Sequence, residues 1–429
     1  MHIAVIGAGL SGLSAAYKLS KKGFDITIFE DSDIGGLASS YLINNYSIEK
    51  YYHHIFRSDR TMLELIHEFE LDNKLEWLKG TTGYYINGKI YPLNTPKEIL
   101  QFPYLSFSDK VKLGLLVQRS KMNQQDLDSI SAKNFIINNA GKSVYYNFFE
   151  PLLNSKFGSS KDNVSASWLL SRIKMRSDRS MSGEKLGYIK GGFCVLVEAI
   201  LAKLHENNVE FIKNPVTKIT SNNNKIKAIE AANEVISCDK VISTIPLNNL
   251  NKIINAKIGL DIRYQGSSCA VLALNTKLFN DIYWLNIKAD VPFGAVIEHT
   301  NFVPWDYYRE HIVYIASYFQ DENDPLWRMS EEAVVDLYVR GLQNLFPTFD
   351  KSSINWWKLT RDIYAAPVFE KGFKSKILPY KTSINGLYVA GMFSLPNYPE
   401  RTMEGSIRAG IDCADELILE STAFAGINS

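Results

Sequence analysis

Three glycines near the start of the chain have the spacing of a phosphate-binding turn. Gly7, Gly9 and Gly12 follow a β-branched run, His2 to Ile6, and precede apolar residues at helical intervals. Gly7 permits a tight turn, Gly9 lets a phosphate group approach the backbone, and Gly12 lets the helix pack against the strand. The first turn of that helix, at Leu10 and Ser11, has backbone N–H groups without helical partners, and these groups attract negative charge. The spacing therefore predicts a buried strand, a turn that binds phosphate groups and a helix.

An acidic residue stands at the end of the next predicted strand. The segment from Asp25 to Glu30 has strand composition, and Asp31 follows it directly. A carboxylate at this place can accept hydrogen bonds from a ribose diol, so Glu30 and its neighbour Asp31 are assigned to the same site. The alternative, glycines that only build a tight turn, does not account for the acid. Together these residues predict a unit that binds a dinucleotide.

A second glycine pair indicates whether the predicted cofactor is a flavin or a nicotinamide dinucleotide. Gly35 and Gly36 are followed by Leu37 and Ala38. This run resembles the extended signature of the flavoprotein superfamily that holds amine oxidases, protoporphyrinogen oxidases, phytoene desaturases and UDP-galactopyranose mutases. The resemblance implies FAD as cofactor, with these four residues beside its pyrophosphate and ribityl chain. Amine oxidases usually carry arginine where Leu37 stands, so the resemblance favours FAD more than it favours amine oxidation.

Two later segments resemble the same superfamily. The segment from Gly386 to Gly391 reads as a strand that runs into a glycine, and a helix with one apolar face starts at Met403. In the superfamily that strand end lies against the FAD pyrophosphate and the helix N-terminus points at the flavin ring, which implicates Gly391 and Met403. Val216 resembles the valine whose backbone touches the adenine.

The expected fold class is α/β, with a Rossmann-like FAD-binding domain and a discontinuous α+β substrate domain. At 429 residues the chain is long for one core, so two packed domains are expected. The resemblance assigns residues 1–75, 185–250 and 375–429 to the FAD-binding domain. It assigns residues 76–184 and 251–374 to the substrate domain.

Bulk composition excludes several classes of partner and site. The 47 basic and 46 acidic residues nearly balance, so no overall field recruits nucleic acid. Four scattered cysteines without a CxxC pair argue against a zinc or other metal site and against a disulfide scaffold. No apolar run approaches the roughly 20 residues that span a bilayer. We expect a cytoplasmic protein. The aromatic and leucine-rich residues 84–118 are interpreted as domain core, with peripheral contact to the inner face of a membrane as the alternative.

Three residues are candidates for the reacting centre. Residues 51–57 resemble a flavin-facing segment of UDP-galactopyranose mutases, in which His54 would aid proton transfer or polarise the flavin. Arg57 would bind an anionic group, and His299 would line the substrate face of the flavin. The ordinary alternatives stay open: a hydrogen-bonded histidine, a surface ion pair and a plain turn. Lys156 could also reach a substrate carboxylate or phosphate.

The leading functional hypothesis is an FAD-dependent oxidoreductase similar to protoporphyrinogen oxidases and desaturases. It would transfer a hydride from a small-molecule substrate to flavin N5 and be reoxidised by oxygen or another acceptor. The alternative is a redox-neutral, flavin-dependent NDP-sugar mutase, and a third reading is a non-enzymatic flavin-binding subunit. The sequence does not predict the substrate or the oligomeric state.

Overall fold

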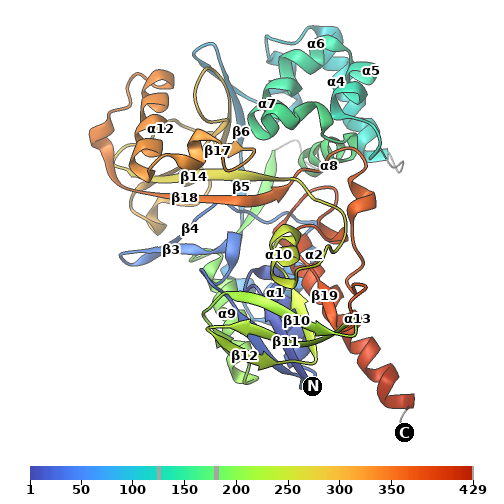
Figure 1. Cartoon of the computed structure of the whole chain (residues 1–429). Coiled ribbons are helices and arrows are strands. Elements are labelled where there is room, and N and C mark those ends of the chain that lie inside the picture. The colour runs from blue at the N-terminus through green and yellow to red at the C-terminus, as the bar shows by residue number, and fades with distance from the viewer. Residues whose placement is uncertain (123–126, 178–182, 428–429) are drawn as a thin grey trace.

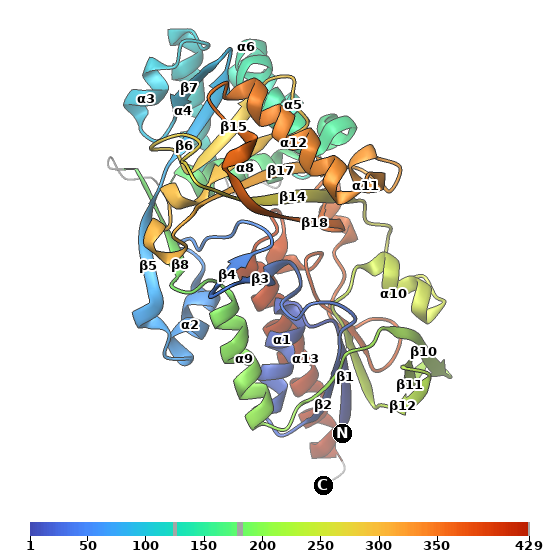
Figure 2. The same cartoon turned by 90° about the vertical axis from the view of Figure 1, so that its left-hand side faces the viewer.

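The computed structural model describes residues 1–122, 127–177 and 183–427. Figures 1 and 2 show two packed parts, each built around a β-sheet, with the N-terminus beside the parallel sheet. Within the described residues, no helix is both long enough and apolar enough to cross a membrane.

The first part is built around a five-stranded parallel sheet. Its strand order is β19 (Leu387–Val389), β13 (Lys240–Ser243), β1 (His2–Ile6), β2 (Asp25–Phe29) and β9 (Glu210–Ile212). The strands are short apolar runs, and β1 is almost wholly buried, as both faces of a parallel sheet require. All five strands come from the three ranges assigned to the FAD-binding domain.

Helices α1 (Leu10–Ser20), α9 (Cys194–Glu206) and α13 (Met403–Ile427) pack together beside the parallel sheet (Figure 2). Helix α13 approaches α1 closely at Gly410, where a Cβ atom would lie 2.1 Å from the Ser11 carbonyl oxygen. This contact brings the N-terminal ends of the two helices together. The helix starts at Met403, as the sequence predicted.

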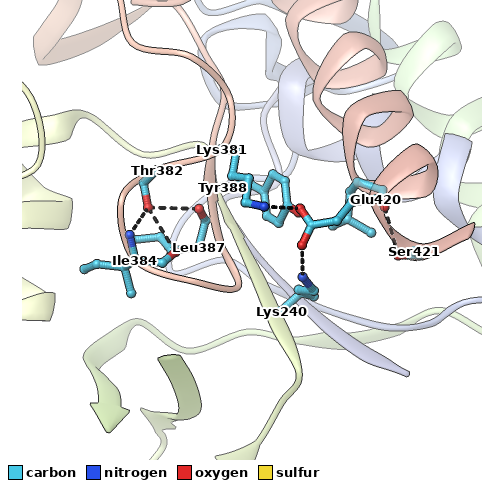
Figure 3. A network of polar contacts seen from close by, with 9 residues as sticks. Lys240, Lys381, Thr382, Ile384, Leu387, Tyr388, Glu420 and Ser421 are labelled. Atoms are coloured by element: carbon cyan, nitrogen blue, oxygen red, sulfur yellow. Dashed lines mark hydrogen bonds and ion pairs between the residues drawn. The ribbon is translucent and has the colours of Figure 1, made fainter. Parts of the chain in front are cut away.

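A polar cluster ties the C-terminal half of α13 to the sheet edge (Figure 3). The Glu420 carboxylate pairs with Lys240 at 3.0 Å and Lys381 at 2.7 Å, and it accepts a hydrogen bond from the Tyr388 hydroxyl. Burial disfavours the charged form of Glu420, but these partners outweigh burial and lower the pKa of its carboxyl to about 2. The cluster therefore fixes α13 to β13 and β19.

The second part is built around a seven-stranded sheet. Its order is β18 (Ile354–Pro367), β14 (Tyr264–Leu274), β17 (His311–Phe319), β16 (Ala295–Glu298), β15 (Trp284–Lys288), β6 (Thr82–Ile86) and β7 (Lys89–Pro92). Side chains of β14 alternate between two cores. Cys269 and Val271 face the core shared with the parallel-sheet part, whereas Ala270 and Leu272 face α12 (Glu331–Leu345). This alternation lets one strand hold the two parts together.

A helical subdomain and smaller elements complete the molecule. The subdomain holds α3 (Pro96–Gln101), α4 (Phe107–Met122), α5 (Ala132–Ala140), α6 (Lys142–Val144), α7 (Glu150–Phe157) and α8 (Ala166–Ser177). The remaining helices are α2 (Arg60–Glu68), α10 (Leu247–Ile254) and α11 (Pro325–Arg328). Small antiparallel sheets pair β3 (Ser40–Ile43) with β4 (Tyr46–Glu49), β5 (Leu75–Gly80) with β8 (Glu184–Ile189), and β10 (Val216–Asn222) with β11 (Lys225–Ala231) and β12 (Glu234–Ser237).

Candidate active site

A cavity of about 680 Å³ lies between the two parts of the molecule. Its size falls within the roughly 300–1,000 Å³ of small-molecule and cofactor sites. Every residue that the sequence assigned to the cofactor lines this cavity except Gly12: Gly7, Gly9, Leu10, Ser11, Glu30, Asp31, Gly35, Gly36, Leu37, Ala38, Val216, Gly391 and Met403. The structure thus brings together segments that lie hundreds of residues apart in the chain.

The two glycine signatures near the N-terminus lie side by side in this cavity. The Gly35 N–H donates to the Ala8 carbonyl at 2.8 Å, and a Cβ atom on Gly36 would lie 3.2 Å from the Gly9 Cα. Gly12 packs behind them, since its Cβ would lie 1.9 Å from the Gly7 carbonyl oxygen. Gly12 therefore supports the turn without reaching the cavity.

Gly9 itself leaves open space. A Cβ atom placed there would meet no described atom within 4 Å, although Gly9 lines the cavity. Gly9 also precedes α1 as its N-cap and offers no capping side chain, so N–H groups of the first turn remain available. An open approach to a helix N-terminus fits a pyrophosphate group.

Glu30 lies directly after β2 and lines the cavity. One carboxylate oxygen accepts the Ala8 N–H at 2.7 Å, and the other accepts the Ser32 N–H and hydroxyl at 3.0 Å. These hydrogen bonds hold the carboxylate in place beside the turn. Each oxygen has further lone pairs, so the group can still accept from a ribose diol.

The C-terminal signature reaches the same cavity. Gly391 follows β19 with a φ of +145°, close to the edge of the region that favours glycine, and a Cβ there would lie 3.2 Å from the Thr244 carbonyl oxygen. The Ser11 hydroxyl donates to the Ser406 carbonyl at 2.8 Å and so links the first turns of α1 and α13. Two helix N-termini therefore border one cavity.

A second, smaller cavity of about 90 Å³ shares part of its wall with the first. Four residues line both cavities: Leu37, Tyr51, His53 and Arg401. The walls of the smaller cavity are largely aromatic and apolar, with Tyr52, Phe157, Trp168, Tyr318 and Phe369 among them, and Lys156 and Glu400 supply charge. We call the four shared residues the junction. The chain therefore places a compact, partly aromatic chamber next to the larger cavity.

His53 is the histidine at the junction. Burial, reinforced by the positive charge of Arg401, lowers the pKa of its imidazole to about 3. The ring is therefore neutral at physiological pH. Its Nδ1 atom is buried and has no hydrogen-bond partner among the described residues, so it is available to a bound molecule.

The three residues predicted to act at the reacting centre lie elsewhere. Within the described chain, neither cavity is lined by His54, Arg57 or His299. His54 Nδ1 lies 3.3 Å from the Tyr283 hydroxyl, and the exposed Arg57 stacks over Trp77 at 4.5 Å. His299 is fully buried, with its Nε2 3.0 Å from the Tyr308 hydroxyl. Each makes the contact expected of a structural residue.

Sequence reasoning missed several lining residues. Thr360, Asp362 and Tyr364 come from β18, which belongs to the seven-stranded sheet yet borders the larger cavity. Arg401 precedes α13 and reaches the junction. The sequence offered two neighbouring histidines, His53 and His54. Adjacent side chains point in different directions, and only the tertiary packing determines which of the two faces the cavities.

The described cavity fits FAD on its own geometry. It joins a glycine cradle without side chains, two helix N-termini and a fixed carboxylate, and these suit pyrophosphate and ribose groups. The unpartnered His53 nitrogen stands farther along, at the junction.

Known proteins agree with this fit. The family model described as flavin containing amine oxidoreductase matches residues 10–418. Coproporphyrinogen III oxidase of Staphylococcus aureus is 31% identical over 178 residues, 38% of each chain. The match thus spans about two fifths of that relative's length. Zeta-carotene desaturase of Synechocystis is 22% identical over 484 residues, 97% of each chain.

Two further similarities widen the range of chemistry. A probable UDP-galactopyranose mutase of Klebsiella pneumoniae is 25% identical over 370 residues, 79% of this chain and 85% of that one. The solved structure of an oxidoreductase from Methanosarcina mazei shares the fold, with a TM-score of 0.74, 17% identity and coverage of 97% and 100%.

Fold and cavity define a flavoprotein, and the predicted α/β class is confirmed. The chain belongs to the flavin-containing amine oxidoreductase family. It is an FAD-dependent oxidoreductase.

Proposed function

We propose that this protein oxidises a small, largely apolar molecule at the junction between its two cavities. The observation that carries the proposal is that Leu37, Tyr51, His53 and Arg401 line both the cofactor cavity and a smaller aromatic chamber. When bound, FAD supplies a hydride acceptor at its N5 atom. The smaller cavity would hold the C–H bond that is oxidised.

The glycine cradle and helix ends would hold the cofactor in one position. Backbone N–H groups at the start of α1 would bind the pyrophosphate, and Glu30 would accept hydrogen bonds from the ribose. Val216 would lie by the adenine. Met403, at the start of α13, would place the positive end of a helix where reduction adds negative charge. These residues bind and orient, and they stabilise charge without moving protons.

His53 is the histidine that we propose to contact bound molecules. Being neutral, it can donate or accept one hydrogen bond at Nδ1 without adding charge. A role for His54, Arg57 or His299 would be indirect, through the packing of Tyr283, Trp77 and Tyr308. We retain the two-domain assignment of the sequence as part of this proposal, with substrate bound where the seven-stranded sheet and helical subdomain meet the cofactor part.

The relatives suggest which substrates to test. One relative is a coproporphyrinogen III oxidase and another a zeta-carotene desaturase, so a porphyrinogen and a carotene are candidates to test. The aromatic walls of the smaller cavity would contact an apolar part of the substrate. Amine oxidation is disfavoured because Leu37 stands where amine oxidases usually carry arginine.

A redox-neutral mutase is the second candidate, supported by the similarity to the Klebsiella protein. It predicts turnover of a nucleotide sugar only when the flavin is reduced beforehand. Net oxidation of a porphyrinogen or a polyene would contradict it.

The test is anaerobic turnover by the purified yellow protein. Coproporphyrinogen III, protoporphyrinogen IX, zeta-carotene in micelles and UDP-galactopyranose are mixed separately with the holoprotein while the visible flavin band is followed. Loss of that band with formation of oxidised product supports the proposal. A fully flavin-loaded protein that isomerises the nucleotide sugar after chemical reduction, and oxidises none of the others, would replace it with the mutase.

A further inference from the structure

Four charged side chains meet at the smaller cavity. Lys156 (α7) and Arg172 (α8) both approach the Glu400 carboxylate, with Lys156 Nζ 3.6 Å and the Arg172 guanidinium 3.4 Å from the same oxygen, Oε1. Arg401 follows Glu400 in the chain and lines both cavities. Two helices thus place two cations against one carboxylate, and a third cation follows that carboxylate in the chain.

Positive charge exceeds negative charge here. Glu400 is the one acid among the lining residues of the smaller cavity, and its side chain is 9% exposed. Asp362, on the side of the larger cavity, attracts Arg401 electrostatically and offsets one further charge. His53 is neutral, and the tyrosines Tyr52 and Tyr318 are kept protonated by burial. Three cations against these two acids leave an excess of one positive charge.

The excess cations have unused donors. Within the described chain, Glu400 is the sole ion-pair partner of Lys156, at 3.6 Å, so it occupies only part of the donor capacity of the ammonium group. The Lys156 side chain is only 22% exposed, and its Nζ stands 4.9 Å from the Trp168 ring centre. Burial, together with the charges of Arg172 and Arg401, outweighs the attraction of Glu400 and lowers the pKa of Lys156 to about 8. The lysine is still mostly protonated at neutral pH.

Burial makes unused N–H donors of a cation unfavourable, and the single contact with Glu400 leaves donors of Lys156 unused. A bound anion with two oxygens would satisfy donors of both Lys156 and Arg401. Its apolar part would then pack against the aromatic walls, Trp168 and Tyr318 among them.

We propose that the substrate carries a carboxylate on an apolar, ring-containing body, and that Lys156 and Arg401 bind this carboxylate beside the flavin. Arg172 acts as a positioning residue, because it touches Glu400 and lines neither cavity. The proposal rests on the function proposed above and narrows its substrate class. It commits to a carboxylate because two cations, Lys156 and Arg401, line a cavity whose other walls are largely aromatic and apolar.

The experiment measures binding to the flavin-loaded protein with matched probes. Calorimetric titration with 1-naphthoate is compared with titration with 1-naphthamide, which has the same ring body without the charge. We expect the acid to bind at least about ten-fold more tightly, as charge-assisted hydrogen bonds predict. Equal affinity of the acid and the amide would overturn the proposal, whatever the variants do.

Two variants separate the site from the fold. Lys156→Met keeps the length and apolar stem of the side chain, and Arg401→Gln keeps a planar polar end. Each should lower naphthoate affinity by about ten-fold and bring the acid-to-amide ratio toward one. The matched control is Lys161→Met, since Lys161 pairs with Glu150 and lines neither cavity. That variant should bind the acid as the parent does.

The outcomes also distinguish this proposal from the one on which it rests. Flavin content is measured in each preparation, and a parent protein that retains no FAD would contradict the proposed function itself. A flavin-loaded parent without acid preference contradicts only the carboxylate site. UDP binding that is stronger than naphthoate binding and is lost in Lys156→Met would assign the same cations to a nucleotide and overturn the carboxylate class.

Discussion

At the scale of single residues, Gly9 and Gly12 offer a contrast between cofactor binding and folding. Gly9→Val should fold and lose FAD, because the new side chain would enter the open space of the cavity while the extended backbone at this position accepts any residue. Gly12→Val should instead fail to fold, since its Cβ would overlap the Gly7 carbonyl. Flavin absorbance per protein and circular dichroism separate the two outcomes. A Gly9→Val protein with full flavin would show that the pyrophosphate does not lie there.

The neighbouring histidines His53 and His54 form a second matched pair. His53→Leu should lower turnover by about 10- to 100-fold with the flavin retained, because it removes a hydrogen-bonding group at the junction. His54→Leu should mainly affect stability, through its contact with Tyr283. The reverse result, a loss of turnover specific to the His54 variant, would support the prediction made from the sequence.

The protonation state of His53 predicts the pH dependence of that effect. Its pKa of about 3 keeps the ring neutral from about pH 5 upward. The ratio of parent to His53→Leu activity should therefore stay constant between about pH 5 and 9. A ratio that changes near pH 6.5 would show a histidine that titrates during turnover.

At the scale of elements, helix α13 depends on its contact with the parallel sheet. Glu420→Gln should lower the free energy of unfolding by roughly 1–3 kcal/mol, because Lys240 and Lys381 lose their ionic partner. The folded pKa of about 2 lies below the ordinary 4.5, so this contribution is complete above about pH 4.5 and is lost as the pH falls toward 2. Thermal unfolding at several pH values measures it.

The control for Glu420 is Glu206→Gln. Glu206 pairs with Lys203 on α9 at 2.8 Å, but both side chains are about half exposed. Exposed pairs contribute little, so this variant should change stability by less than about 1 kcal/mol. Equal losses in the two variants would mean that the Glu420 cluster does not fix α13.

Local patterns made some elements predictable and left others hidden. The β1-turn-α1 unit follows from an apolar run, glycines and helical spacing, all within 20 residues. The contribution of β18 to the cavity could not be predicted, because it depends on how a 14-residue strand of one sheet passes the other part of the molecule. The orientation of His53 likewise depends on tertiary contacts. The cofactor residues could be assigned because glycine turns have a recognisable spacing in the sequence. The smaller cavity is lined by ordinary aromatic side chains, which form no such motif.

At the scale of the whole molecule, an apolar stripe on α4 bears on peripheral membrane contact. Phe107, Val111 and Leu115 are 75%, 48% and 51% exposed at helical intervals of four, and the exposed Lys112 and Arg119 lie on the same helix. We predict that the protein co-sediments with vesicles of phosphatidylglycerol and phosphatidylcholine. Phe107→Ser with Leu115→Ser should weaken binding at least about ten-fold, since two apolar side chains no longer leave water.

The control for the stripe is Leu42→Ser. Leu42 is 77% exposed on the β3–β4 hairpin, away from α4, so its loss should leave vesicle binding unchanged. A parent protein that stays in the supernatant at low ionic strength would contradict membrane contact, and the stripe would then be ordinary exposed surface.

FAD binding should couple the stability of the two parts of the molecule. The larger cavity takes residues from the glycine turns of the parallel-sheet part and from β18 of the seven-stranded sheet, so a ligand there contacts both. A ligand present at 100 times its dissociation constant stabilises the folded state by about 2.7 kcal/mol. Removal of the flavin should therefore lower Tm and expose sites in both parts to limited proteolysis, and added FAD should reverse both effects.

Gly9→Val, which cannot accept the pyrophosphate, should show the lowered Tm without any response to FAD. The contrary result would be stoichiometric FAD rebinding that protects the parallel-sheet part alone. The seven-stranded sheet would then not contribute to cofactor binding.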